Sequence, residues 1–156
     1  MTVLRRSLEL PYRANDLFDL VSDVGRYPDF VRWIQSLRVI DEQEEGTRTT
    51  VRAEATVGFL TFTERFTTDV AAERDGRNIE VSLVRGPFRR LKNTWSFAPT
   101  EGGTRIDFLI DFQFRNFVLQ ALAAANLDFA VQRIIEAFQD EAARRYTKVS
   151  AAQPSV

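Results

Sequence analysis

The apolar positions at the start of the chain follow first a strand-like and then a helical period. Residues 3–10 alternate apolar and polar side chains, which predicts a strand. Apolar residues then recur at helical spacing over 16–24, and Asn15 is expected to cap that short helix at its N-terminus. A second short helix is predicted for residues 27–34. The beginning of the chain therefore predicts one strand followed by two short helices.

A period of two dominates residues 35–114. Turn signals such as Asp75-Gly76 divide this stretch into short alternating segments, a pattern typical of antiparallel hairpins with one apolar face. The apolar face of the last segment consists of Ile106, Phe108, Ile110, Phe112 and Phe114. Asp107 and Asp111 alternate with them and are expected to face solvent.

The last element is predicted to be one continuous helix. Residues 117–147 contain neither Gly nor Pro, and their apolar residues recur at helical spacing, so the helix would be about 45 Å long. These elements predict an α+β fold in which a curved antiparallel sheet wraps around the long C-terminal helix. Residues 1–148 are expected to form a single domain, and residues 149–156 a disordered tail.

Composition excludes several kinds of chemistry. The chain has 156 residues with no Cys and no His, which excludes disulfides, Cys/His zinc sites and a Ser-His-Asp triad. Basic and acidic residues are interleaved and the net charge is −1, so no DNA-binding stripe is predicted. No secretory signal is recognisable, and a cytoplasmic protein is expected. These features favour binding over catalysis, with no catalytic residue, metal or cofactor predicted.

Small and aromatic side chains share the predicted inner face of the sheet. Such a mixture can line an apolar ligand cavity, and the alternative is a dry core in which the same residues pack against one another. The predicted lining consists of Val51, Ala53, Phe62, Phe66, Trp95, Phe108, Phe112, Leu122 and Phe129.

Three polar residues share the parity of these apolar positions. Glu64, Arg85 and Asn93 are therefore predicted to point inward, where a polar group is tolerated if it meets a ligand or a partner. They are candidates for orienting the polar head of a ligand. A β-bulge, or a place at the rim of the sheet, is the alternative explanation.

Large apolar side chains also gather in the second short helix. Tyr27, Phe30, Trp33 and Ile34 are predicted to form either the mouth of the cavity, where they would touch a membrane, or a packed core under that helix.

Several segments resemble one known family. They are residues 17–31 (LFDLVSDVGRYPDFV), 91–97 (LKNTWSF) and 110–114 (IDFQF), followed by Ala137-Phe138 in the last helix. In this order and spacing, they are similar to the coenzyme-Q-binding START-like family. That family belongs to the helix-grip superfamily, which also contains polyketide aromatases and cyclases and the lipid-transfer START domains.

The resemblance implies a sheet of six or seven strands gripping the C-terminal helix, with a lipid-sized tunnel between them. It implies a carrier or chaperone that binds ubiquinone or another polyprenyl lipid in support of respiratory electron transport. Transient contact with the inner face of the cytoplasmic membrane is expected. Two alternatives remain: a ribosome-directed role, since close relatives are named ribosome-association toxins, and a cyclase that uses Glu64 with Arg85.

Overall fold

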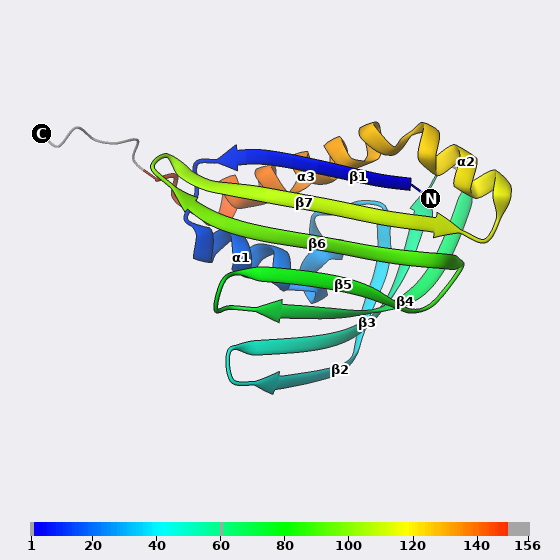
Figure 1. Cartoon of the computed structure of the whole chain (residues 1–156), viewed down its shortest axis with the longest axis horizontal. Helices are drawn as coiled ribbons and strands as arrows, with labels where there is room; N and C mark the ends of the chain where they lie inside the picture. The colour runs from blue at the N-terminus through cyan, green and yellow to red at the C-terminus, as the bar shows by residue number, and fades with distance from the viewer. Residues whose placement is uncertain (1, 60, 150–156) are drawn as a thin grey trace, which may run out of the picture.

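One antiparallel sheet of seven strands forms the frame of the molecule (Figure 1). The computed structural model describes residues 2–59 and 61–149. The strand order is β1-β7-β6-β5-β4-β3-β2, so consecutive strands from β2 to β7 are neighbours and β1 joins the far edge of β7. The strands are β1 (Thr2–Leu10), β2 (Ile34–Glu45), β3 (Arg48–Phe59), β4 (Phe62–Glu73), β5 (Asn78–Arg85), β6 (Phe88–Thr100) and β7 (Gly103–Phe114). The prediction of six or seven strands is confirmed.

The helices lie on one face of the sheet, called here the inner face (Figure 1). They are α1 (Ala14–Ser22), the 3-10 helix η1 (Val24–Asp29), α2 (Phe117–Ala125) and α3 (Leu127–Arg145). Ile106 and Phe108 of β7 belong to one buried core with Val131 and Phe138 of α3. The predicted inward face of the last strand and the helix-grip arrangement are therefore confirmed.

The C-terminal helix is not continuous, contrary to the prediction. It divides at Asn126 into α2 and α3, which meet at a bend of 64°. The Asn126 side chain donates to the Leu122 carbonyl, as does its backbone N–H, so Asn126 closes the last turn of α2. Asn competes for backbone hydrogen bonds in this way more readily than the alanines that precede it. Among the described residues, no single helix is long and apolar enough to cross a bilayer. Helices α2 and α3 reach that length and apolarity only when they are taken together across their bend.

The predicted short helices differ in their boundaries. Helix α1 begins at Ala14 with Arg13 at its N-cap position, so the prediction of Asn15 as the cap is wrong. The Asn15 side chain instead accepts a hydrogen bond from Arg77 Nε. The second helix is η1, which ends before Phe30, and Ile34 begins β2. In the predicted tail, the Val149 N–H donates to the Pro11 carbonyl, and residues 150–156 lie outside the described part.

An aromatic cluster joins η1 to α3. The rings of Tyr27 and Phe30 each lie 5.3 Å from the ring of Phe138, whose other neighbour at 5.5 Å is Trp95. The Tyr27 hydroxyl donates to the Val21 carbonyl near the end of α1. Of the two explanations for the aromatic segment, packing under the helix therefore describes Tyr27 and Phe30.

Strongly alkaline solution is expected to unfold the protein through Tyr27. Burial, with a smaller contribution from the Asp23 carboxylate, raises the pKa of its hydroxyl above the ordinary value of 10.0. The pKa in the folded state exceeds that in the unfolded state. The part of the folding free energy that depends on a neutral Tyr27 hydroxyl is therefore complete below pH 10.0 and is lost as the pH rises above it. Circular dichroism and tyrosinate absorbance should change together.

Tyr27→Phe is the matching variant. It should lower the free energy of unfolding at neutral pH by about 1 kcal/mol, since the Val21 carbonyl loses its donor, and it should flatten the dependence on alkaline pH. Ionisation of Tyr27 near pH 10 in protein that stays folded would contradict the prediction.

Candidate ligand-binding site

The inner face has two parts that differ in burial. In the first, Val51, Ala53, Trp95 and Phe108 are all less than 10% exposed and belong to the main core. Trp95 contacts Phe108 at 4.8 Å and Phe138 of α3 at 5.5 Å between ring centroids. For these four predicted lining residues, the structure shows the dry-core alternative.

The second part lies where α2 crosses the sheet and is called the α2 end. A small buried cluster of Phe88, Phe112 and Ala123 forms its floor. Around it are half-buried apolar side chains that share the inner face or project from the helices. Those packed against the cluster are Phe66, Leu83, Leu91, Ile110, Phe114 and Leu127. Further half-buried apolar side chains, on the same face of β3 and β4 or on α2, are Ala55, Val57, Phe62 and Leu122.

A chain of aromatic rings connects the strands at the α2 end. The Phe66 ring lies 5.3 Å from that of Phe88, which stacks on Phe114 at 4.3 Å. Phe114 in turn contacts Phe112 at 5.8 Å. Opposite Phe66 in the β3–β4 register is Ala55, whose methyl group leaves room beside the rings. This side offers apolar surface that is only partly covered by the protein itself.

Asn93 lies on the inner face between the two parts, in register with Val81 of β5 and Ile110 of β7. Its Oδ1 accepts from Trp95 Nε1 and its Nδ2 donates to the Leu109 carbonyl, both at 2.7 Å. An amide has two N–H donors and two acceptor lone pairs, so one of each remains for a further partner. The two bonds hold the amide in a fixed orientation next to the α2 end.

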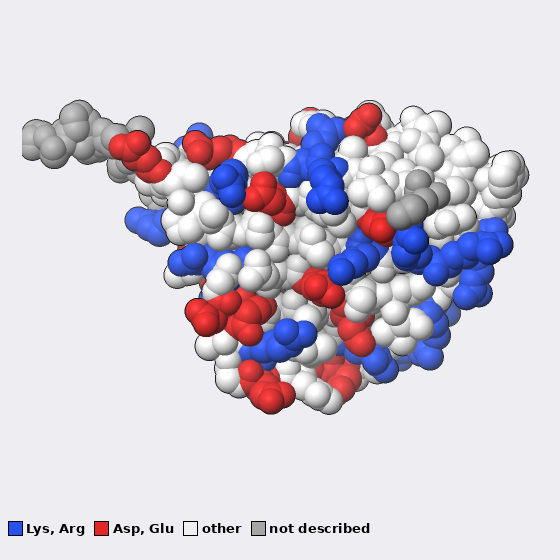
Figure 2. Space-filling view, viewed as in Figure 1, with Lys and Arg blue, Asp and Glu red and all other residues white. Residues whose placement is uncertain are grey.

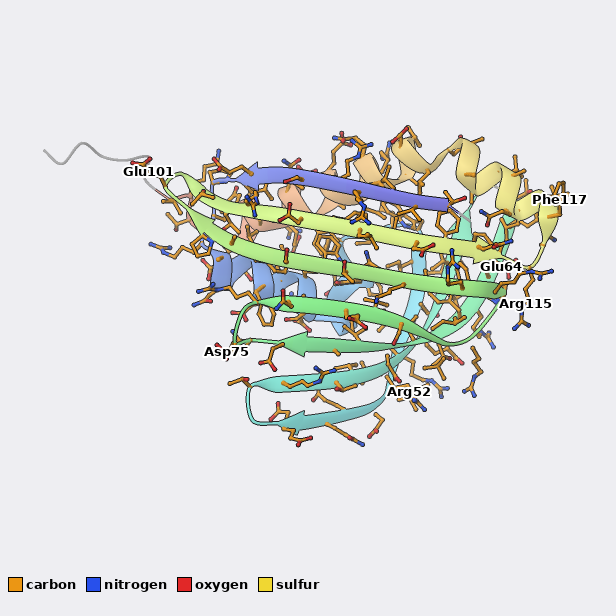
Figure 3. All side chains as sticks on the ribbon, in the orientation of Figure 1. Arg52, Glu64, Asp75, Glu101, Arg115 and Phe117 are labelled. Carbon is orange, nitrogen blue, oxygen red and sulfur yellow. The ribbon has the colours of Figure 1, made fainter. Side chains whose placement is uncertain are left out.

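Glu64 also has the inward parity that the sequence predicted. It pairs with Val57 in an unbroken β3–β4 register and is half-buried. Figure 3 shows it at the same end of the molecule as Arg115 and Phe117.

Arg85 does not point inward, contrary to the prediction. The β4–β5 register shifts between Thr67 and Thr68, which places Arg85 opposite Thr67 and reverses its facing. Its side chain is exposed, and no ion pair between Glu64 and Arg85 occurs among the described residues. The acid–base pair considered for a cyclase is therefore not assembled.

The prediction that Phe129 lines the cavity is also wrong, because its side chain is 65% exposed. The prediction continued the apolar face of one straight helix, whereas the bend at Asn126 turns the first residues of α3 away from that face.

Two hollows lie away from the α2 end. One of about 750 Å³ is on the outer face of β1, β7, β6 and β5, where Arg5, Glu80 and Asp107 contribute to a mixed polar lining. A smaller one of about 190 Å³ lies between α1 and the β2–β4 strands, beside Phe18, Val51 and Arg74. The first hollow includes Trp95 and Phe108 and the second Val51, but neither brings together the full set of residues that the sequence predicted to line a cavity.

A family model described as polyketide cyclase/dehydrase and lipid transport matches residues 10–139. The chain belongs to this family. The polyketide cyclase/dehydrase and lipid transport family includes START-like proteins that bind hydrophobic ligands, in agreement with the apolar inner face. The predicted resemblance is confirmed at that level.

Two named proteins are similar to this chain over most of its length. A ribosome association toxin RatA from Pseudomonas aeruginosa is 35% identical over 146 residues, which cover 93% of this chain and 98% of that protein. The mitochondrial coenzyme Q-binding protein COQ10 homolog B from Xenopus laevis is 28% identical over 88% of this chain and 56% of that protein. Both are described by what they bind or associate with, in agreement with the prediction that the chain is not an enzyme.

Solved structures agree on the fold. The 18 kDa protein CC1736 from Caulobacter crescentus has a TM-score of 0.80 and 42% identity, covering 92% of this chain and 97% of that one. The Zhui aromatase/cyclase from Streptomyces sp. R1128 has a TM-score of 0.78 and 16% identity, covering 97% and 98%. The second likeness concerns the helix-grip fold alone.

Several residues of the α2 end were not among the ligand-binding residues predicted from the sequence. Phe88 follows the Gly86-Pro87 turn, and a register shift before Arg90 separates it from the alternation of β6. Leu83 and Leu91 had the correct parity in the predicted strands, which was the available signal. Leu127 lay beyond prediction because it follows the bend.

Proposed function

We propose that this chain binds ubiquinone or a related polyprenyl lipid at the α2 end without changing it chemically. As a carrier or chaperone, it would support respiratory electron transport from the cytoplasm, at the inner face of the membrane. The observation that carries the proposal is the set of half-buried apolar side chains around Phe88 and Phe112, bordered by the oriented amide of Asn93. The likeness to a coenzyme Q-binding protein supports the choice of ligand.

The proposed orientation of the lipid follows from the polarity of the side chains around the site. The tail would cover Ala55, Phe66 and Leu122, each buried methylene contributing about 0.8 kcal/mol. The free N–H of Asn93 would donate to a quinone oxygen. Tail burial supplies most of the affinity, and the amide selects the head group.

Ala55→Trp is expected to weaken binding of a short-tailed ubiquinone by at least about tenfold, because the indole would occupy the surface beside Phe66. Ala55 is only half-buried, so the new side chain has space and the folded state should persist. Isothermal titration and a thermal melt measure the two effects.

Ala71→Trp provides the matched control. Ala71 is also half-buried in a strand, but its parity places it on the outer face, so ligand affinity should stay unchanged. Equal affinity of Ala55→Trp and the wild type would exclude the α2 end as the site. A wild type that binds no quinone would exclude the proposed ligand.

Ribosome association is the second candidate function, favoured by the 35% identity with RatA over nearly all of both chains. Co-sedimentation of the protein with purified ribosomal subunits tests it. Co-sedimentation of a chain that also binds no quinone would favour this function over the first.

A further inference from the structure

Two large apolar side chains project from the first turn of α2 into solvent. Phe117 is 86% exposed and Val118 is 58% exposed. The helix carrying them (FVLQALAAA) contains no charged residue. Figure 3 shows Phe117 at the outermost point of this end of the molecule. Exposed apolar side chains concentrated in one turn are typical of a binding surface.

This turn is held in a fixed position. The Asn116 side chain caps α2 by accepting from the Leu119 N–H. The Gln120 amide bonds on both sides, accepting from the Phe114 N–H and donating to Thr2 Oγ1. Phe117 and Val118 are thus presented by a helix anchored to two strands.

Four exposed arginines lie at or next to the turn between β5 and β6: Arg65, whose backbone is adjacent to Gly86 of that turn, and Arg85, Arg89 and Arg115. Arg115 directly precedes α2, and its N–H donates to the Pro87 carbonyl, which brings the turn between β5 and β6 alongside. Arg85 and Arg89 flank that turn, and Phe88 pairs with Phe114 in the β6–β7 register.

These four guanidinium groups have no ion-pair partner among residues 2–59 and 61–149. The neighbouring carboxylate of Asp111 is bound by Arg90, and Glu64 is half-buried on the inner face. Figure 2 shows a broad uncharged surface over α2 with a band of basic residues next to it. The positive charge of this surface is therefore available to a partner.

We propose that this surface docks onto an anionic lipid bilayer. We name it the α2 tip, comprising Phe117, Val118 and the four arginines. Phe117 and Val118 enter the boundary between headgroups and acyl chains, and the arginines contact lipid phosphates. The α2 tip takes the place of Tyr27 and Phe30, which the sequence had suggested for this contact and which pack on Phe138 instead.

A bilayer fits these features better than RNA or a second copy of the chain. RNA phosphates would account for the arginines but leave Phe117 and Val118 in water. A symmetric contact through the tip would bring two sets of four arginines together. The acidic segment of β2 (Asp41, Glu42, Glu44 and Glu45) lies away from α2, so an anionic surface would also orient the molecule with the tip toward it (Figure 1).

Vesicle co-sedimentation of the full chain, without added quinone, tests the proposal. Wild type is expected to bind phosphatidylcholine vesicles containing phosphatidylglycerol, and to bind pure phosphatidylcholine at least about tenfold more weakly. Phe117→Ser with Val118→Ser should reduce binding to anionic vesicles by about tenfold or more. Arg89→Gln with Arg115→Gln should reduce it by about fivefold per residue and weaken its salt dependence.

The matched charge control is Arg13→Gln with Arg48→Gln. Both arginines are exposed and lie at the opposite end of the strands, so vesicle binding should be retained. Wild type that ignores anionic vesicles, or a Phe117→Ser/Val118→Ser variant that binds them normally, would overturn the proposal. So would a dimer that this variant dissociates, or arginine-dependent binding to ribosomal RNA without vesicle binding.

A site-specific probe gives a second readout, because the chain has no cysteine of its own. Phe117→Cys and Asp75→Cys place an environment-sensitive fluorophore at the two ends of the molecule (Figure 3). Only the label at position 117 should shift to shorter wavelength on adding anionic vesicles. Equal shifts at both positions, or none at 117, would contradict docking through the tip.

Discussion

Replacing Gly103 by alanine is expected to lower the free energy of unfolding by about 4 kcal/mol or more. Gly103 begins β7 with φ +149°, a conformation that side-chain-bearing residues rarely adopt. A Cβ atom there would overlap the Leu10 carbonyl oxygen and lie 2.8 Å from Pro11 Cα. Both neighbours are backbone at the end of β1, so relief would require separating β1 from β7. Urea unfolding followed by circular dichroism measures the effect.

The adjacent glycine provides the control. Gly102 lacks the positive φ, and the atom nearest to an added Cβ is the tip of the Glu9 side chain at 3.4 Å. Gly102→Ala should therefore change stability by less than about 1 kcal/mol. Similar losses for the two variants would show that turn composition, not the close approach of β1, determines the requirement for glycine.

Phe138→Ala is expected to lower the free energy of unfolding by about 3–5 kcal/mol. Phe138 is 7% exposed and its ring contacts Tyr27, Phe30 and Trp95, so it joins η1 and β6 to α3. Removing the ring leaves a cavity that three elements cannot close together, because each is held by its own hydrogen bonds.

Phe129→Ala in the same helix is the matched control. Its ring is mostly exposed and its described partner is the Arg133 guanidinium at 5.7 Å, so the loss should be below about 1 kcal/mol. Comparable losses at positions 129 and 138 would mean that helix propensity, not the aromatic cluster, dominates the effect.

The strands were predictable from sequence because their facing depends only on a period of two. Alternation from Ile106 to Phe114 was long enough to define both faces of β7, and the structure has the same facing. Arg85 shows the limit of this argument, since a single register shift between β4 and β5 reverses the facing of the strand end. Nothing in the residues of β5 alone indicates where that shift occurs.

The helices were less predictable where tertiary contacts determine the end of a helix and the side chains that it exposes. Absence of Gly and Pro predicted one straight helix, yet one Asn with two hydrogen bonds to Leu122 ends α2. That bend exposes Phe129 and creates the α2 end, so the prediction of the site failed at the same place as the prediction of the helix. The division between packed core and half-buried surface could not be predicted either. That division depends on which strands the Phe138 ring contacts, and these contacts form only in the folded protein.

The pairing of β1 with β7 also has a consequence for biosynthesis. Its register runs from Leu10 opposite Thr104 to Thr2 opposite Phe112, so the first strand made waits for one of the last. At typical translation rates this delay is on the order of 5–20 s, during which the apolar side of β1 is unpaired. A nascent chain halted before β7 would keep that edge available to chaperones or to other strands. Synthesis of β7, not of the strands before it, is then the step that pairs this edge and protects it from aggregation.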